Sequence, residues 1–327
     1  MTPAPPSPEP GPLSTDPVLV EAVDRLPAAA IPEVRSLLAA ASAADGVRPV
    51  SEEAELRLQH GGPAGGADLT ARAADGTLLG YARLEVPPAE PEAEAELVVA
   101  PAARRRGVGS ALAARLETTA GDRPLRVWAH GELPGSAELA RGRGYERARV
   151  LLQMRRPLAG VDPDPQLTLP EGVRIAPFRP GVDEDAWLRV NARAFSAHPE
   201  QGRWTRDDLA LREAEPWFDP AGLFLAWRDE PGGPRLLGSH WTKVHPAGDV
   251  GPDPVGEVYV LGIDPDAQGM RLGRALTDVG LAHLRARGLA EVLLYVEEDN
   301  TAAVSLYERS GFTRYAVDVS WRRAPRA

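Results

Sequence analysis

Two segments of the sequence carry residue types and spacings that could bind a phosphate group. The first reads ELVVAPAARRRGVGSAL over residues 96–112, and the second reads VLGIDPDAQGMRLGRAL over residues 260–276. In each, an apolar strand leads into a turn with glycine that opens an apolar helix. Backbone N–H groups of such a turn converge at the positive end of the helix dipole, where they attract phosphate. The same turn could simply cap a helix, and its spacing alone does not decide between the two interpretations.

One position departs from the shared pattern. Arg271 stands in the second segment where Gly107 stands in the first. A residue with a side chain is compatible with the turn if its φ is negative, because its amide then stays available to a ligand. Arg271 therefore leaves the detailed geometry of the second loop open, and its long side chain could add a phosphate contact.

The two segments are copies of one unit. An offset of 164 residues pairs Pro101 with Pro265 and Gly109 with Gly273. A period this long indicates two duplicated domains. We expect a disordered proline-rich tail at residues 1–17, an N-terminal domain at 18–160, a linker at 161–172 and a C-terminal domain at 173–327. Each half predicts an α/β (α+β) fold, with a mixed, mostly antiparallel sheet flanked by helices.

The spacing of Arg104, Gly107 and Gly109 resembles the acetyl-CoA motif Q/R-x-x-G-x-G/A of the GNAT acetyltransferase family. The resemblance implies acetyl-CoA as co-substrate, with room for one molecule per domain. Loop amides would hold its pyrophosphate, at Arg105, Arg106, Gly107, Val108, Gly109 and Ser110, and at Gln268, Gly269, Met270, Arg271, Leu272, Gly273 and Arg274. The preceding strand residues would bind the pantetheine arm, at Leu97, Val98 and Val99, and at Leu261, Gly262 and Ile263.

Amide formation from an ammonium group and a thioester needs a base and an acid. Glu257 begins the strand that leads to the second loop, and Tyr307 lies in a helix that Asn300 caps and Gly311 ends. Glu257 could instead be a surface residue of its strand, and Tyr307 a core residue with a satisfied hydroxyl.

The repeat itself separates these interpretations. At the offset of 164 Glu257 meets Ala93, and at an offset of 167, which pairs Gly144 with Gly311, Tyr307 meets Ala140 and Asn300 meets Leu133. The glutamates that flank Ala93 point to the opposite face of a strand. The first domain therefore keeps a cofactor loop but lacks both the base and the acid, and we expect the second domain to be catalytic.

A closer resemblance rests on the segments HPEQG (198–202), WFDP (217–220), HWTKVHP (240–246), GEVYV (256–260) and LLYVE (293–297). Together with the tandem arrangement they resemble the mycothiol synthase family. The resemblance implies acetyl transfer to the cysteinyl amine of a cysteine–glucosamine–inositol conjugate, with Glu257 as general base and Tyr307 as general acid. It implies substrate contacts at Glu52, Glu200, Lys243, Glu257 and Tyr295, and further acetyl-CoA contacts at Asn300, Thr301, Ala302, Ala303, Val304 and Ser305.

Composition limits the function classes. The net charge of −10 argues against nucleic acid, and the absence of cysteine excludes a thiolate metal site and a covalent cysteine intermediate. With no long apolar run we expect no membrane partner, and the lack of cysteine fits the cytoplasm. We also expect a monomer, since a tandem pair of domains could substitute for a dimer, and no metal. Two alternatives remain open, namely an N-acetyltransferase for another small-molecule or protein amine, and a non-catalytic acyl-CoA-binding regulator.

Overall fold

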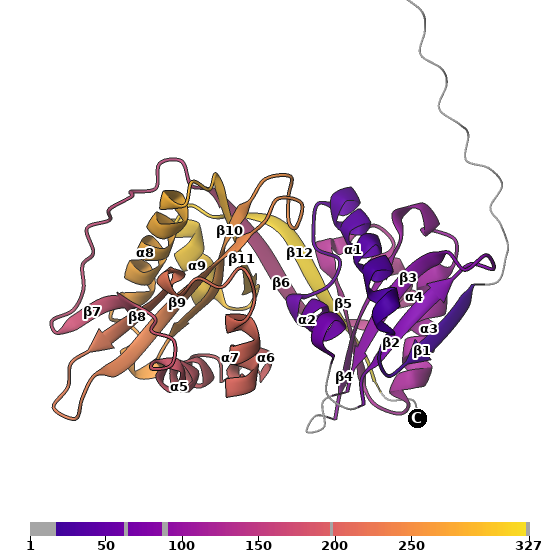
Figure 1. Ribbon diagram of the computed structural model, residues 1–327, viewed down its shortest axis with the longest axis horizontal. Helices are drawn as coiled ribbons and strands as arrows, with labels where there is room; N and C mark the ends of the chain where they lie inside the picture. The colour runs from indigo at the N-terminus through magenta and orange to yellow at the C-terminus, as the bar shows by residue number, and fades with distance from the viewer. Residues whose placement is uncertain (1–17, 62–64, 87–90, 197–198, 325–327) are drawn as a thin grey trace, which may run out of the picture. The chain divides into compact units, whose positions relative to one another are not determined.

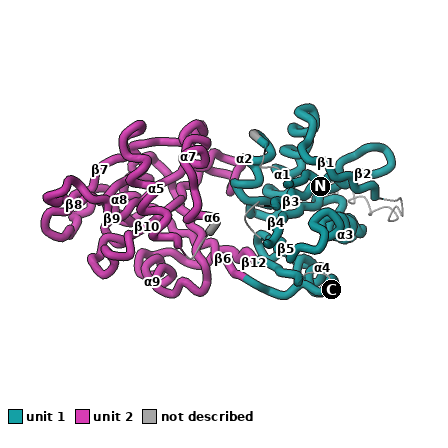
Figure 2. The backbone as a smooth tube through the Cα atoms, turned by 90° about the horizontal axis from the view of Figure 1, so that it is seen from below, with its two compact units in different colours: residues 1–148, 320–327 teal, residues 149–319 magenta. Residues whose placement is uncertain are grey.

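The computed structural model describes residues 18–61, 65–86, 91–196 and 199–324, so the tail predicted at residues 1–17 lies outside the described residues. The chain divides into two compact units (Figure 2). Unit 1 extends to Ala148 and takes in the chain again from Ser320, and unit 2 is Arg149–Val319. The last strand therefore begins in unit 2 and ends in unit 1. No helix of the described ranges has the length and apolar character needed to cross a membrane.

Unit 1 is built on five strands that lie side by side in chain order, with only the last pair parallel. They are β1 (Leu19–Val23), β2 (Ala67–Arg72), β3 (Leu78–Glu85), β4 (Ala93–Val99) and β5 (Leu125–Ala129). Helices lie on both faces of this sheet (Figure 1). Tyr81 packs with α1 (Ile31–Asp45) and α2 (Glu52–His60), whereas its neighbour Gly80 lies against Leu112 of α3 (Val108–Ala120). Shorter helices are η1 (Ala28–Ala30), η2 (Pro101–Ala103), η3 (His130–Glu132) and α4 (Ser136–Gly142).

Unit 2 repeats this plan with longer strands. Its order is β12-β6-β11-β10-β9-β8-β7, and of the pairs from β6 to β7 only β10 with β11 is parallel. The strands are β6 (Glu146–Pro157), β7 (Val173–Pro177), β8 (Leu223–Arg228), β9 (Arg235–His245), β10 (Val255–Ile263), β11 (Glu291–Glu297) and β12 (Thr313–Arg323). The helices are α5 (Glu184–Ala194), α6 (Pro199–Gly202), α7 (Arg206–Glu213), η4 (Pro220–Gly222), η5 (Pro265–Ala267), α8 (Leu272–Ala286) and α9 (Thr301–Arg309).

Two hydrophobic clusters lie on opposite faces of the unit 2 sheet. On one face Trp187 of α5 packs with Trp241 and Val260. On the other face Val258 and Leu294 pack with α8 and α9. These layers confirm the predicted fold class of two tandem domains, each a mixed sheet with helices on both sides.

Candidate active site

The two glycine loops have nearly the same backbone. Each contains two residues in the left-handed region, one glycine and one arginine, in swapped order. In unit 1 these are Arg105 (φ +60°) and Gly107 (φ +84°), and in unit 2 they are Gly269 (φ +81°) and Arg271 (φ +61°). The φ of Arg271 is therefore positive, so the condition under which a side chain fits this turn without strain is not met. An ideal Cβ at Gly107 or Gly269 meets no atom within 4 Å, so an arginine there causes no clash and costs about 1–2 kcal/mol of backbone strain.

Hydrogen bonds around the loops also repeat. In unit 1 the Ala103 N–H donates to the Ala100 carbonyl over 2.8 Å, and in unit 2 the Ala267 N–H donates to the Asp264 carbonyl over 2.8 Å. Each loop then starts a long helix, α3 after Gly107 and α8 after Arg271, and neither of these residues caps its helix with a side chain. The N–H groups of both first turns are therefore directed at the loop, as an anion site requires.

The parallel strands beside each loop separate before they end. In unit 2 the pairing of β10 with β11 stops at Val258 and Leu294, although both strands continue. A bulge between Val258 and Val260 interrupts the pairing of β10 with β9 at the same level. The residues Leu261, Gly262 and Ile263 pair with β9 on one side and face the widened gap on the other.

In unit 1 the gap opens later. The β4–β5 register begins with Ala93 opposite Leu125 and runs to Glu96 opposite Trp128. In unit 2 Glu257 is opposite Leu293, and pairing ends one residue later. The bulge adds one residue to β10, whereas β3 and β4 pair without a bulge. Counted from the last pair before each loop, Glu257 and Glu94 are therefore both the sixth residue paired with the antiparallel neighbour, and the expected match of Glu257 with Ala93 is wrong. With Glu94 matched to Glu257, parallel pairing extends one residue further in unit 1.

Glu257 lies in the middle of the unit 2 sheet and is almost completely buried. Its side chain is 7% exposed and its Oε2 accepts a 2.6 Å hydrogen bond from Nε2 of His245. Lys243 is its register partner on β9, so the two side chains share a face of the sheet. Lys243 is also buried, with Nζ 4.5 Å from the ring centroid of Trp217 and 5.2 Å from that of Tyr259.

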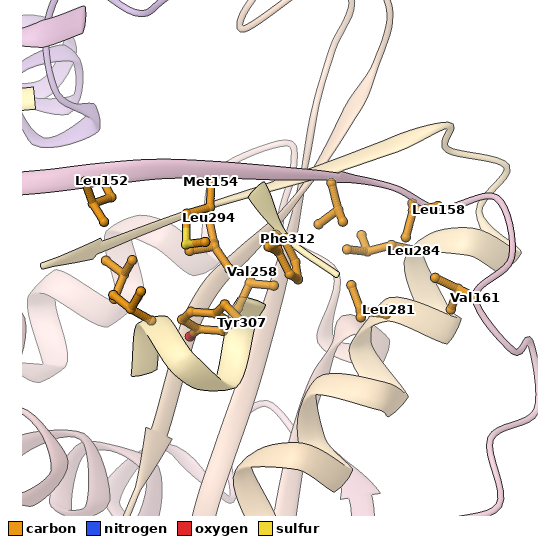
Figure 3. Close-up of a cluster of buried hydrophobic side chains, with 13 residues drawn as sticks. Leu152, Met154, Leu158, Val161, Val258, Leu281, Leu284, Leu294, Tyr307 and Phe312 are labelled. Carbon is orange, nitrogen blue, oxygen red and sulfur yellow. The ribbon is translucent and has the colours of Figure 1, made fainter. Parts of the chain in front are cut away.

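Tyr307 lies on α9, on the other face of the same sheet. Its ring packs with Val258, Leu294 and Phe312, and the Phe312 ring centroid is 5.7 Å away in an edge-to-face arrangement (Figure 3). Burial raises the pKa of Tyr307 above its ordinary value, and no other group shifts it. The phenol is therefore protonated at neutral pH.

Glu257 and Tyr307 lie on opposite faces of the sheet, beside the residues where β10 and β11 separate. Glu257 and Val258 are consecutive in β10, so their side chains point to opposite faces. Tyr307 packs on the Val258 face. A ligand that entered between β10 and β11 would therefore meet a carboxylate on one side and a phenol on the other.

Comparison with known proteins agrees with this geometry. The family model of the acetyltransferase (GNAT) family matches residues 35–145 and 186–312. A mycothiol acetyltransferase of Geodermatophilus obscurus is 76% identical over 94% of this chain and 98% of its own length, and one of Thermomonospora curvata is 55% identical over 90% and 95%. The chain belongs to the GNAT acetyltransferase family. A solved tandem GNAT protein from the clavulanic acid biosynthesis pathway shares the fold, with a TM-score of 0.73 and 22% identity over 95% of this chain and 100% of that chain.

This acetyltransferase therefore uses acetyl-CoA to acetylate an amine, with its two GNAT domains in tandem. Hydrogen bonds at the ends of α4 and α9 support the match of Tyr307 with Ala140 in the repeat. The Phe312 N–H donates to the Tyr307 carbonyl and the Tyr145 N–H to the Ala140 carbonyl, each over 3.0 Å. The two helix ends thus superpose residue by residue, and unit 1 has a methyl group where unit 2 has a phenol.

The other residues predicted for the acetyltransferase's site fall into two groups. Tyr295 lies on β11 on the face of Glu257, and its hydroxyl accepts a 2.8 Å hydrogen bond from Gln153. Asn300 caps α9, because its side chain accepts from the Ala303 N–H over 3.2 Å, and residues 301–305 form the first turn and a half. Glu52 begins α2 in unit 1, and Glu200 belongs to α6.

Unit 1 of the acetyltransferase contains a pocket of about 520 Å³ at its own loop. Its wall includes Val99, Gly107, Ala140 and, from the last strand of the chain, Trp321. Glu96 lies behind this wall, 3.5 Å from the wall residue His130, and it accepts a 2.7 Å hydrogen bond from the Ser51 N–H. Burial alone would raise the pKa of Glu96, but its bonds to His130 and Ser51 outweigh burial and lower it. This carboxylate is held in its ionised form by the protein itself.

Two residues of the site were not predicted from the sequence. His245 joins Glu257 to Asp249, with Nδ1 2.5 Å from an Asp249 oxygen. Both belong to the hairpin between β9 and β10, and His245 lies inside the segment HWTKVHP that carried the resemblance. Its alternation with Lys243 along β9 was the available signal, because residues two apart share a face.

Proposed function

We propose that this acetyltransferase moves an acetyl group from acetyl-CoA to the cysteinyl amine of a cysteine–glucosamine–inositol conjugate, the last step of mycothiol biosynthesis. The observation that carries the proposal is the 76% identity, over 94% of the chain, to a protein named mycothiol acetyltransferase. The matched 94% of the chain extends over both domains.

In the proposed reaction Glu257 takes a proton from the acceptor ammonium group. The free amine attacks the thioester carbonyl carbon, and the tetrahedral intermediate collapses as the C–S bond breaks. The Tyr307 hydroxyl gives its proton to the departing thiolate, and the nitrogen loses its second proton to solvent, from which the tyrosine is reprotonated. Burial of both side chains on opposite sides of one gap supports these roles, because the amine approaches the reacting carbon and the thiolate departs from it in different directions.

The predicted acceptor contacts suit a polyol that carries an ammonium group. Lys243 and Tyr295 share the face of Glu257, and each offers a polar atom there. Glu52 and Glu200 would add carboxylates. These four residues are proposed as acceptor ligands, and the conjugate's hydroxyl groups are the chemistry they would recognise.

For unit 1 we propose acetyl-CoA binding without turnover. The support is the intact loop and its pocket, together with Ala140 in place of the acid and an ion pair of Glu94, the register equivalent of the base, with Arg126. The longer pairing of β4 with β5 also leaves less room for an acyl group between those strands.

An acetylation assay tests the proposed function. The purified protein is incubated with acetyl-CoA and either the cysteine–glucosamine–inositol conjugate, the same conjugate without cysteine, or a panel of other amines, and released CoA thiol is measured. We expect kcat/KM for the full conjugate to exceed that for every other amine by at least about tenfold, a difference of about 1.4 kcal/mol. Equal or better turnover of another amine would overturn the acceptor, and acetyl-CoA binding without any turnover would favour a regulator.

A further inference from the structure

His245 is a buried ring held between two carboxylates. Its side chain is 1% exposed, Nδ1 lies 2.5 Å from Oδ2 of Asp249, and Nε2 lies 2.6 Å from Oε2 of Glu257. Carboxylate oxygens accept hydrogen bonds, so each ring nitrogen must carry a proton when both acids are ionised. The ring is then an imidazolium that donates to both.

The hairpin that carries these groups is anchored in the sheet. His245 is opposite Val255 at the end of β9. In the turn that follows, the Asp249 N–H donates to the Pro246 carbonyl over 3.2 Å. The next residue, Val250, packs with Val255 and Leu293, and its carbonyl accepts a 2.9 Å hydrogen bond from Arg155. The ring and Asp249 therefore have fixed positions relative to Glu257.

The charge balance favours the imidazolium. Burial opposes a charge on the ring, but the hydrogen bonds to Asp249 and Glu257 outweigh burial and raise the pKa of His245 above its ordinary value. Lys243, on the same strand, acts in the opposite direction. Arg155, on β6, donates hydrogen bonds to the Val250 carbonyl and to Glu291, so its positive charge is paired with Glu291. The two hydrogen bonds thus favour a cationic ring between the two carboxyl groups.

Resting on the proposed role of Glu257 as the base, we infer that His245, held by Asp249, is a positioning residue for acetyl transfer. Its Nε2–H fixes Oε2 of Glu257 and leaves Oε1 for the acceptor amine. The charge of the ring favours the anionic form of the carboxyl group that it contacts, so loss of that charge should favour the protonated acid, which cannot accept a proton from the amine. Asp249 holds the opposite side of the ring and keeps it protonated.

Three variants separate this role from simple packing. His245→Gln keeps an N–H donor for Glu257 and removes the charge. Asp249→Asn keeps an acceptor for Nδ1, and its side chain is 28% exposed, so the fold tolerates the change. Asp253→Asn, in the same hairpin, removes an exposed carboxylate without touching the ring and is the matched control.

The measurement is the pH profile of kcat/KM for acetyl transfer, with acetyl-CoA affinity determined in parallel. We expect His245→Gln to move the acidic limb upward by about 1–3 pH units, and Asp249→Asn to move it in the same direction by less, with acetyl-CoA affinity unchanged. Asp253→Asn should follow the unaltered protein. A limb that stays in place in both His245→Gln and Asp249→Asn would overturn the inference.

Glu257→Gln, assayed at the same time, distinguishes this failure from failure of the proposed function. If Glu257→Gln keeps full activity, Glu257 is not the base and the proposed mechanism fails, and the inference fails with it. If Glu257→Gln loses activity while the limb of both other variants stays in place, the base stands and only the role of His245 is wrong.

Discussion

Acid should destabilise unit 2 through one buried histidine, His240. Its ring is completely buried under α8, and Nδ1 is 2.7 Å from the Leu276 carbonyl, so Nδ1 carries the proton. Within the described residues Nε2 has no hydrogen-bond partner. An ideal Cβ at Gly280 would lie 2.1 Å from the ring, which shows how closely the helix covers it. A second proton would thus place a charge in a dry core.

The size of the effect follows from the pKa. Burial, with a smaller contribution from His283, lowers the pKa of His240 from 6.5 to about 4. The unfolded chain then binds this proton more tightly than the folded chain, so the contribution is fully present above pH 6.5 and is lost as the pH falls towards 4. A pKa of about 4 in the folded chain against 6.5 in the unfolded chain lowers the free energy of unfolding by about 3 kcal/mol well below pH 4 and by about 2.5 kcal/mol at pH 4.5.

Urea unfolding at pH 7 and pH 4.5, followed by tryptophan fluorescence, measures this loss. Five of the seven tryptophans belong to unit 2, so the signal mainly reports that unit. The matched variant is His240→Asn, whose amide can donate to the Leu276 carbonyl and does not titrate. We expect the unaltered protein to lose about 2.5 kcal/mol more than the variant between the two pH values. An equal loss in both proteins would refute the reasoning, because other groups would then account for all of the acid sensitivity.

Three further predictions concern the site. Glu257→Gln should lower kcat/KM most at neutral and lower pH, where the acceptor amine is protonated, and steady-state rates at higher pH should show a smaller defect. A loss that is constant with pH would mean that Glu257 only binds substrate. Tyr307→Phe should lower kcat and leave acetyl-CoA affinity, measured by calorimetry, unchanged, whereas Ala140→Tyr should create no activity in unit 1. Full kcat in Tyr307→Phe would show that Tyr307 is not the general acid. Arg271→Gly should raise the free energy of unfolding in urea by up to about 1 kcal/mol, because it relieves left-handed strain; a decrease would show that φ is not positive in solution.

The repeat made much of the fold and site predictable. A loop that binds phosphate through backbone amides requires a similar local sequence wherever it occurs. Because the chain contains this sequence twice, Gly109 and Gly273 identified both loops. The counterpart in the repeat also separated Tyr307 from an ordinary helix residue, and the shared helix ends at Ala140 and Tyr307 support that match. The match of Glu257 with Ala93 failed, because the bulge in β10 shifts the register by one residue and no sequence pattern reports the bulge.

Other features depend on packing that no local pattern reports. The positive φ at Arg271 is imposed by the loop's surroundings, because arginine by itself prefers a negative φ. The bulge beside Tyr259 carries no glycine or proline signal. The contact of His245 with Asp249 and Glu257 requires the exact register of β9 and β10, and the passage of β12 into unit 1 requires knowledge of which sheet its end joins.

The central claim is that acetyl transfer takes place in unit 2 and that unit 1 does not turn over. Its most direct test places a glutamate at equivalent positions of the two loops, Ser110→Glu and Arg274→Glu, both on exposed residues in the first turn of their helices. A carboxylate there repels a pyrophosphate group, and a repulsion of about 1.4 kcal/mol or more weakens binding at least tenfold. We predict that steady-state kcat/KM for acetyl-CoA falls about tenfold or more in Arg274→Glu and stays within about twofold in Ser110→Glu. A large loss in Ser110→Glu with normal turnover in Arg274→Glu would contradict the assignment of catalysis to unit 2.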